Sequence, residues 1–423
     1  MNGTTTQAGT ITLTAEEASI LDGARGPAPR KALQFQIEVG NFFGARRMVP
    51  ITNAHVMGDI EVMGDGGLEF MRALSEDESA CAVPTSRNAT CMHGDDLACL
   101  HQDSGEIAKE QEIVVHMRKS RIATTDTCIN YQTVYQPKLG EHVAWGDTGT
   151  VAYANSVFGA RTNYEGGYSS FAAALTGRTP EYGFHLDEVR RGSFLVKVQA
   201  RLDDLADWGA LGKLVGHPNQ DYFAVPVFDH AREMPSSDAL KHLGASLASY
   251  GSMAMFHMIG VTPEAQTQAV AFGGGRPQFE LTVTDADLEA VYRGYRYVEG
   301  CKNLVVFSAP QLSLFEIKVL AELFDGRRVA PGMEVFITTS HPNYAEAQRL
   351  GYAQALERSG VVFLKGVCFY ILQGLTRMRM ENGWANLVSN SGKLVNTITA
   401  HRFNTVLRRT PECVEIACTG VLR

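Results

Sequence analysis

The last part of the chain alternates apolar, strand-like runs with segments of helical spacing, and this alternation restricts the fold more than any other feature. The apolar runs cover residues 304–307, 333–337 and 361–364, and amphipathic segments at 314–323 and 344–358 separate them. Strands that alternate with helices in this way fold as a parallel sheet with helices on both faces. The pattern therefore predicts an α/β fold with parallel sheets covered by helices.

The length of the chain predicts more than one lobe. At 423 residues it exceeds what one small core requires, and two or three α/β lobes are expected. The glycine-rich stretch at 273–277 is the best internal boundary. We therefore expect a disordered tail at 1–10 and a first α/β region at 11–275. A second α/β region is expected at 276–423.

The charge balance and the start of the chain exclude several classes of protein. The net charge is −8 and the basic residues occur in pairs, which argues against nucleic acid as the main partner. No run of 18 apolar residues occurs, so no membrane-spanning helix is expected. The polar first residues lack the basic and hydrophobic stretches of a signal peptide, and this predicts a cytoplasmic protein.

Two of the eight cysteines follow predicted strands. Cys128 lies in a loop rich in hydroxyl groups, and Cys368 follows the apolar run at 361–364. Ligands of parallel sheets bind at the carboxyl ends of the strands, so either cysteine is a candidate iron ligand or nucleophile. The alternative is a buried, apolar cysteine. Two thiolates do not complete an iron–sulfur site, which usually takes three or four.

Two polar loops are candidates for binding an anion. The first runs from Asn390 through Ser391 to Lys393, where Ser391 or Lys393 is suited to shuttle a proton; the alternative is a polar turn with a solvated lysine. The second is a glycine-containing turn at 146–150, followed by a helical segment that contains Asn155 and is closed by residues 161–163. No Walker loop, GxGxxG motif or Ser-His-Asp spacing is present.

Several segments, in order along nearly the whole chain, together resemble the aconitase X family. They include residues 54–56, Thr85 with Asn88, Thr127-Cys128 with Tyr131, Trp145 with residues 153–163, residues 261–265, Cys368, and residues 390–393. The resemblance implies an aconitase-like fold that buries an iron–sulfur cluster and a substrate between its lobes. It also implies dehydration of a small hydroxylated carboxylate such as cis-3-hydroxy-L-proline or mevalonate 5-phosphate. A separate small subunit with a swivelling domain is expected as partner.

The resemblance, read together with the polar loops, gives a set of expected site residues. We expect catalytic roles for Ser391, Lys393 and His55, and cluster ligation by Cys128 and Cys368. The residues expected to bind substrate are Thr85, Asn88, Thr148, Arg161, Asn163 and Asn390. The iron would act as a Lewis acid on the leaving hydroxyl, and a protein base would remove the proton.

The chain departs from the family at the expected third cluster ligand. Where many members have Gly-Cys-Pro-His, this chain has Ser308-Ala309-Pro310-Gln311, and Cys301 lies eight residues upstream of Ala309. Three hypotheses follow. The cluster survives on Cys128, Cys368 and a substitute ligand in a dehydratase; or the cluster is reduced or lost in an enzyme for another lyase, isomerase or cyclisation reaction; or the chain is a non-catalytic subunit.

Overall fold

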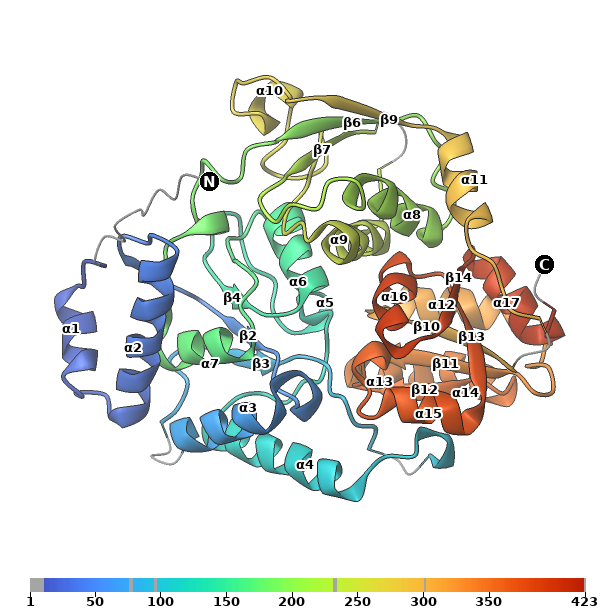
Figure 1. The fold of residues 1–423 in the computed structure, drawn as a ribbon, viewed down its shortest axis with the longest axis horizontal. Coiled ribbons are helices and arrows are strands. Elements are labelled where there is room, and N and C mark those ends of the chain that lie inside the picture. Colours follow the sequence, from blue (N-terminus) through green and yellow to red (C-terminus); the bar gives the residue numbers. More distant parts are fainter. Residues whose placement is uncertain (1–10, 76–78, 95–96, 231–233, 300–301, 422–423) are drawn as a thin grey trace, which may run out of the picture.

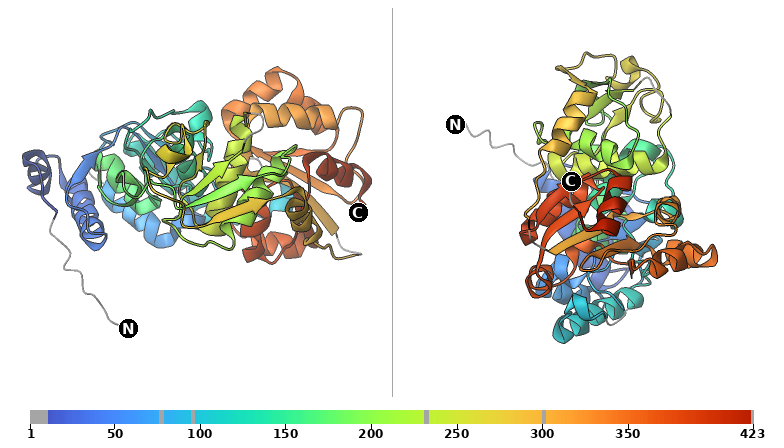
Figure 2. Two further views of the ribbon diagram at one scale, coloured as in Figure 1. Left: turned by 90° about the horizontal axis from the view of Figure 1, so that it is seen from above. Right: turned by 90° about the vertical axis from the view of Figure 1, so that its right-hand side faces the viewer.

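The computed structural model describes residues 11–75, 79–94, 97–230, 234–299 and 302–421. Its helices and strands gather in three lobes, coloured blue to green, green to yellow, and orange to red in Figure 1. The large core contains apolar residues of all three lobes, and Figure 2 shows the lobes from two further sides. This confirms the predicted multi-lobed α/β architecture. The tail predicted at 1–10 lies outside the described residues.

The first lobe is built around a three-stranded parallel sheet with the order β3-β2-β4 and an antiparallel pair, β1 and β5. Helix α2 packs on α7, α3 packs on α4, and α7 lies against β2. The strands are β1 (Met48–Pro50), β2 (Ala54–Val56), β3 (Thr85–Arg87), β4 (Ala144–Trp145) and β5 (Arg178–Pro180). The helices are α1 (Ala15–Leu21), α2 (Pro27–Phe42), α3 (Ile60–Ser75), η1 (Ala98–Leu100), α4 (Ser104–Lys119), α5 (Asn130–Thr133), α6 (Thr148–Tyr153), η2 (Ala154–Phe158), α7 (Gly167–Thr176) and η3 (Gly183–His185).

The second lobe has a four-stranded parallel sheet with the order β8-β7-β6-β9. Its strands are β6 (Phe194–Val198), β7 (Pro226–Asp229), β8 (His257–Met258) and β9 (Glu280–Val283). Its helices are α8 (Leu205–Gly216), α9 (Ser237–Gly251), α10 (Gln268–Ala271) and α11 (Asp285–Arg293). Because β9 pairs with β6, the boundary predicted between residues 275 and 276 cuts through this sheet.

The third lobe has a five-stranded parallel sheet with the order β12-β11-β10-β13-β14. Its strands are β10 (Lys302–Leu312), β11 (Glu334–Thr339), β12 (Val362–Lys365), β13 (Trp384–Ser389) and β14 (Asn404–Leu407). Its helices are α12 (Leu314–Leu323), α13 (His341–Arg349), α14 (Tyr352–Arg358), η4 (Phe369–Ile371), α15 (Leu375–Asn382), α16 (Gly392–Thr397), η5 (Ile398–His401) and α17 (Thr410–Thr419).

The third sheet has two apolar faces, and successive side chains of each strand point alternately to one face and to the other. Val305 and Phe307 of β10 pack into a core with α12, α14 and α17. Leu304 and Val306, on the opposite face, belong to the large core that also contains apolar residues of the first and second lobes. Because side chains alternate along a strand, β10 joins its own lobe to the other two.

The lobes bring the carboxyl ends of two sheets face to face. The turn after β4 starts at Gly146 and leads into α6, while the turn after β13 starts at Asn390 and leads into α16. Asp147 of the first turn forms an ion pair with Lys393 at the start of the second helix. Ligands of parallel sheets bind at such ends, so this junction is the candidate site.

Among the described residues, none of the helices is long and apolar enough to cross a membrane.

Candidate active site

The two candidate cysteines lie on loops that one glutamine joins. The backbone N–H of Gln311 donates to the Cys128 Sγ, and the N–H of Cys128 donates to the Gln311 Oε1, both at 3.3 Å. The Gln311 Nε2 donates to the carbonyls of Asp126 at 3.2 Å and Val367 at 3.1 Å. Gln311 therefore joins the loop of Cys128 to Val367, the residue that precedes Cys368.

Both cysteine side chains are buried, and burial favours their neutral form. Burial, with a smaller contribution from the nearby carboxylate of Asp147, raises the pKa of Cys128 to about 12. Burial also raises the pKa of Cys368 well above its ordinary value, with the neighbouring Cys128 adding to the effect. Without a bound cation both groups therefore stay as thiols.

Ala309 lies between the two cysteine loops, at the position expected for a third ligand. The hydroxyl of its neighbour Ser308 accepts a hydrogen bond from the N–H of Phe369 at 3.3 Å, next to Cys368. Two residues further on, Gln311 contacts Cys128. The Ala309 carbonyl accepts a hydrogen bond from the Ser391 hydroxyl at 2.6 Å. The three positions therefore converge, but Ala309 offers a methyl group where a thiolate is expected.

Lys393 enters this junction on the first turn of α16. The helix is capped by Ser391, whose hydroxyl accepts from the N–H of Leu394 at 3.1 Å. Gly392 lets α16 approach α8, because a Cβ there would lie 2.9 Å from the carbonyl of Gly209. The Lys393 Nζ lies 3.5 Å from the Asp147 Oδ2, and both side chains are at most 5% exposed. The alternative of a solvated lysine is therefore wrong.

Lys393 keeps its proton in this setting. Burial opposes the charge of Lys393, but Asp147 and then Tyr370 favour it, and on balance its pKa is raised above the ordinary value. The Nζ also lies 5.7 Å from the centre of the Tyr370 ring. Asp147 is held in place as the cap of α6, where its Oδ1 accepts from the N–H of Thr150 at 3.1 Å. The site thus combines a buried ammonium with a fixed carboxylate.

His55 lies on β2, close enough to Asp147 to interact with it electrostatically, and is fully buried. Its Nδ1 lies 2.8 Å from the Ser86 hydroxyl, and its Nε2 lies 3.3 Å from the Asn88 Oδ1. Burial lowers the pKa of His55 to about 4, although the carboxylate of Asp147 opposes this. The imidazole is therefore neutral at physiological pH and suited to orient Asn88.

Two of the residues expected to bind substrate, Thr148 and Asn390, follow strands at the junction, whereas Thr85 begins β3 at the opposite, amino end of that strand. Thr148 is the first residue of α6 and is half-buried. The Thr85 hydroxyl donates to the Val83 carbonyl at 2.9 Å. The Asn390 amide donates to the Thr410 hydroxyl at 3.1 Å. The part of these three side chains in substrate binding stays a prediction.

Arg161 and Asn163 have their polar groups engaged in holding the loop at residues 182–187. The Arg161 guanidinium donates to the His185 carbonyl at 2.8 Å and forms an ion pair with Asp187. Asn163 donates to the Tyr182 carbonyl at 3.0 Å and accepts from the N–H of Phe184 at 2.9 Å. In this structure both side chains stabilise the loop.

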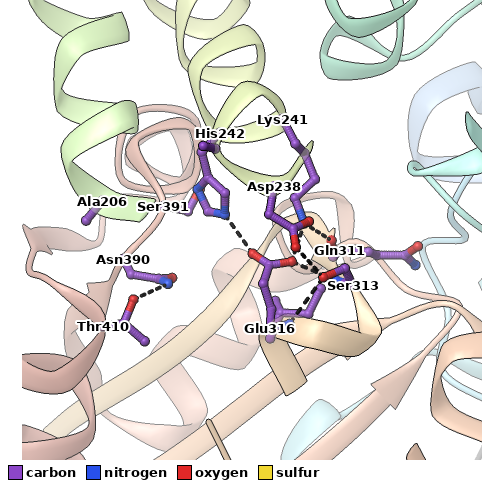
Figure 3. A network of polar contacts seen from close by, with 12 residues as sticks. Ala206, Asp238, Lys241, His242, Gln311, Ser313, Glu316, Asn390, Ser391 and Thr410 are labelled. Atoms are coloured by element: carbon purple, nitrogen blue, oxygen red, sulfur yellow. Dashed lines mark hydrogen bonds and ion pairs between the residues drawn. The ribbon is translucent and has the colours of Figure 1, made fainter. Parts of the chain in front are cut away.

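A buried ionic network behind Gln311 was not foreseen from the sequence (Figure 3). Lys241 of α9 lies 3.0 Å from Asp238, forms an ion pair with Glu316 of α12, and donates to the Gln311 carbonyl at 3.3 Å. The His242 Nε2 lies 2.8 Å from the Glu316 Oε1. We call Asp238, Lys241, His242 and Glu316 the clamp, because they fasten the second lobe to the third.

Two cavities flank the junction. One of about 1070 Å³ lies between the second and third lobes, and its lining includes Trp208, Phe315 and Asn390. The other, of about 670 Å³, lies between the first and third lobes, and its lining includes Arg87 and Lys365. The larger cavity comes within one residue of Ser391, since Asn390 forms part of its wall.

The side chains at the junction do not fit a cluster held by three cysteines. In the part of the chain that the structure describes, no group of three or more histidine, cysteine, aspartate or glutamate side chains is arranged to hold a metal ion. Cys128 and Cys368 supply two thiols, and Ala309 supplies a methyl group. Iron–sulfur clusters usually require three or four thiolates, so this donor set falls short.

Family models of known proteins match the chain over nearly its whole length. Residues 10–188 match the Aconitase X first domain, residues 192–293 the second domain and residues 302–419 the third domain. These three matches coincide with the three lobes.

The chain is also similar to individual dehydratases. It is 35% identical to the phosphomevalonate dehydratase large subunit of Thermococcus kodakarensis, over 90% of this chain and 93% of that protein. It is 32% identical to the cis-3-hydroxy-L-proline dehydratase of Pseudomonas aeruginosa, over 90% of this chain and 65% of that protein. The crystal structure of Thermococcus kodakaraensis aconitase X in its holo-form superimposes with a TM-score of 0.85 at 33% identity, covering 96% of this chain and all of that one.

Proposed function

The chain belongs to the aconitase X family of hydro-lyases, and from this premise we propose that it removes water from a small hydroxylated carboxylate such as cis-3-hydroxy-L-proline. The observation that carries the proposal is the buried ion pair of Lys393 and Asp147 at the meeting strand ends. A buried ammonium attracts a substrate carboxylate and stabilises negative charge that develops during elimination. The near-complete burial of the pair favours a small substrate.

The proposed roles follow from what an elimination needs. One group must take a proton from carbon, and another must protonate the leaving hydroxyl. Lys393 and Ser391 are proposed to contact the substrate, because Ser391 caps the start of α16 and Lys393 lies in its first turn. The neutral His55 holds Asn88 in place.

The remaining predicted residues are assigned to substrate binding. Thr85, Asn88, Thr148 and Asn390 are proposed to bind the substrate, and Arg161 and Asn163 to support it by fixing the loop at 182–187. An iron–sulfur cluster would supply a Lewis acid for the leaving hydroxyl. Since the donor set does not fit a three-thiolate cluster, the roles above are assigned to protein groups alone.

A separate small subunit is proposed as the partner. The relatives from Thermococcus kodakarensis and Methanocaldococcus jannaschii are both named large subunits. The Pseudomonas aeruginosa enzyme is longer than this chain, which matches 65% of it. The support for a partner is that the first two relatives are named large subunits, which implies a separate small subunit.

The test is a substrate panel assayed with and without the small subunit. Cis-3-hydroxy-L-proline, its trans isomer and mevalonate 5-phosphate are incubated with the chain alone and with the co-produced partner, and the products are followed by NMR. The proposal expects one hydroxylated carboxylate to lose water, with faster turnover in the presence of the partner. A product isomeric with its substrate would point to the isomerase alternative, and no turnover by the complete complex on any of these compounds would contradict the proposal.

A further inference from the structure

The site differs from a cluster site at the atoms where a third ligand would be needed. The Ala309 side chain is fully buried, and its carbonyl is engaged by Ser391. On one side, the Cys128 Sγ accepts a hydrogen bond from the Gln311 N–H. On the other, the N–H of Phe369, next to Cys368, donates to Ser308. Hydrogen bonds from backbone N–H groups and from the Ser391 hydroxyl thus connect residues 308–311 to their surroundings between the two cysteine loops.

Cys301 is the cysteine nearest to Ala309 in the sequence, and it lies outside the described residues. Its neighbour Lys302 begins β10 and pairs with Trp384, the first residue of β13. Ala309 lies seven residues further along β10, or roughly 23 Å at the rise of an extended strand. Lys302 and Ala309 are therefore far apart along β10, and a Cys301 variant tests separately whether that thiol serves as a ligand.

The junction already contains both partners of a proton transfer. The Lys393 Nζ and the Asp147 Oδ2 are 3.5 Å apart. Asp147 is fixed through its other oxygen, Oδ1, by Thr150, whose hydroxyl also donates to the Cys128 carbonyl at 2.8 Å. The carboxylate therefore has one oxygen committed to the helix cap and one directed at the ammonium.

We propose that this chain eliminates water with Lys393 and Asp147 as an acid–base pair, without the three-thiolate iron–sulfur cluster. The inference rests on the proposed hydro-lyase function and names the groups that carry it out. Asp147 takes the proton from the substrate carbon, and the electron pair of that C–H bond forms the double bond as the C–O bond breaks. The Lys393 ammonium gives its proton to the departing hydroxyl, which leaves as water. The proton on Asp147 then passes to the Lys393 amine, and both groups return to their starting state.

The cluster is tested without any substrate. The full chain, alone and with its small subunit, is purified anaerobically, incubated with iron and sulfide, desalted, and analysed for iron, sulfide and visible absorbance. The wild-type protein is expected to keep neither iron nor sulfide. The Ala309→Cys variant is expected to gain both, with a charge-transfer band, because it restores a third thiolate beside Cys128 and Cys368. Ala309→Ser is the matched control and should stay colourless.

A stoichiometric cluster in the wild-type protein would overturn the inference. Loss of that cluster in Cys301→Ser would identify Cys301 as the third ligand. The wild-type result decides the point even if Ala309→Cys does not fold. Should the wild type lack iron and yet dehydrate none of the panel substrates, the proposed function fails while the absence of the cluster stands.

The acid–base pair is tested on whichever substrate is turned over. We expect kcat to survive dialysis against an iron chelator and to fall about 10²- to 10⁴-fold in Asp147→Asn, as for the loss of a general base. Asp147→Glu should recover part of the rate and shift the pH profile. Loss of activity on chelation, or an Asp147→Asn variant with an unchanged kcat, would contradict the assignment.

Discussion

Lys393 is the residue on which the proposed chemistry depends most, because it brings a positive charge to a site that is closed to water. Replacement by methionine keeps most of the volume and removes the charge and the proton. We expect kcat/KM of Lys393→Met to fall by roughly 10²- to 10⁴-fold. The matched control is Lys365→Met, which removes a lysine from the neighbouring cavity, where its Nζ lies 5.2 Å from the Tyr344 ring. Equal activity of the two variants would contradict the role of Lys393.

His55 should make the folded state sensitive to acid. Its pKa is about 4 in the folded chain, against an ordinary value of 6.5. Between these values the unfolded chain binds the proton and the folded chain does not, so the free energy of unfolding decreases as the pH falls. A shift of this size corresponds to about 3 kcal/mol.

Urea unfolding of wild type and His55→Gln between pH 7 and pH 4 measures this contribution of His55. The wild type should lose more stability than the variant over this interval. Parallel curves would show that His55 does not contribute.

Lys393 and Gln311 differ in how far their roles could be predicted from the sequence. Cys128 and Cys368 were predicted as site residues from their positions after predicted strands, and Lys393 from its polar loop and from the family resemblance. Gln311 and Lys241 were missed because their partners lie far away in the sequence, on other lobes. Patterns among residues that are close in the sequence do not predict contacts between residues that are far apart in it.

Helix α16 depends on a close approach to α8 that a methyl group would prevent. A Cβ on Gly392 would lie 2.8 Å from the Ser246 Oγ and 2.9 Å from the Gly209 carbonyl. We expect Gly392→Ala to lower the free energy of unfolding by roughly 1–3 kcal/mol, as for an overpacked core, and to lower activity by displacing Lys393. Gly166→Ala is the control, since a Cβ there meets no atom within 4 Å. Equal stability of the two variants would contradict this account of α16.

The clamp should couple α9 to α12 energetically. Lys241→Met leaves Glu316 buried without its ammonium partner, which costs on the order of 3–5 kcal/mol for a buried pair. Adding Glu316→Gln removes the unpaired charge, so the double variant should be less destabilised than the sum of the two single variants. Chemical denaturation of the four proteins measures this coupling, and strictly additive effects would show that the pair does not interact.

The strands and helices of the third lobe could be predicted because the spacing of apolar residues differs clearly between its buried strands and its amphipathic helices. The boundary at 275/276 was placed at a glycine-rich stretch, but that stretch connects α10 to β9, which returns to the sheet of β6. The connection between two parallel strands of one sheet is not marked by a change in the local amino-acid composition. Pairing between distant strands, rather than the nature of the loop, sets the limits of the second lobe.

At the scale of the whole molecule, three lobes share one core and none of them contains the complete site. The first contributes Asp147 and Cys128, the third contributes Cys368 and Lys393, and the second holds Gln311 through the clamp. The arrangement of the lobes therefore determines the geometry of the proposed acid–base pair. The family resemblance predicted a site between the lobes, and Ala309 lies there at the position where that resemblance led us to expect a third cysteine.

Loss of one water from a hydroxylated carboxylate is the reaction that defines the proposed enzyme, and mass spectrometry of the product measures it directly. The complete complex is incubated with cis-3-hydroxy-L-proline beside matched complexes that carry Lys393→Met or Lys365→Met. We predict a product lighter by one water with the wild type and with Lys365→Met, and unchanged substrate with Lys393→Met. Unchanged substrate in all three reactions would contradict dehydration of this substrate, and equal product with Lys393→Met would contradict the proposed site.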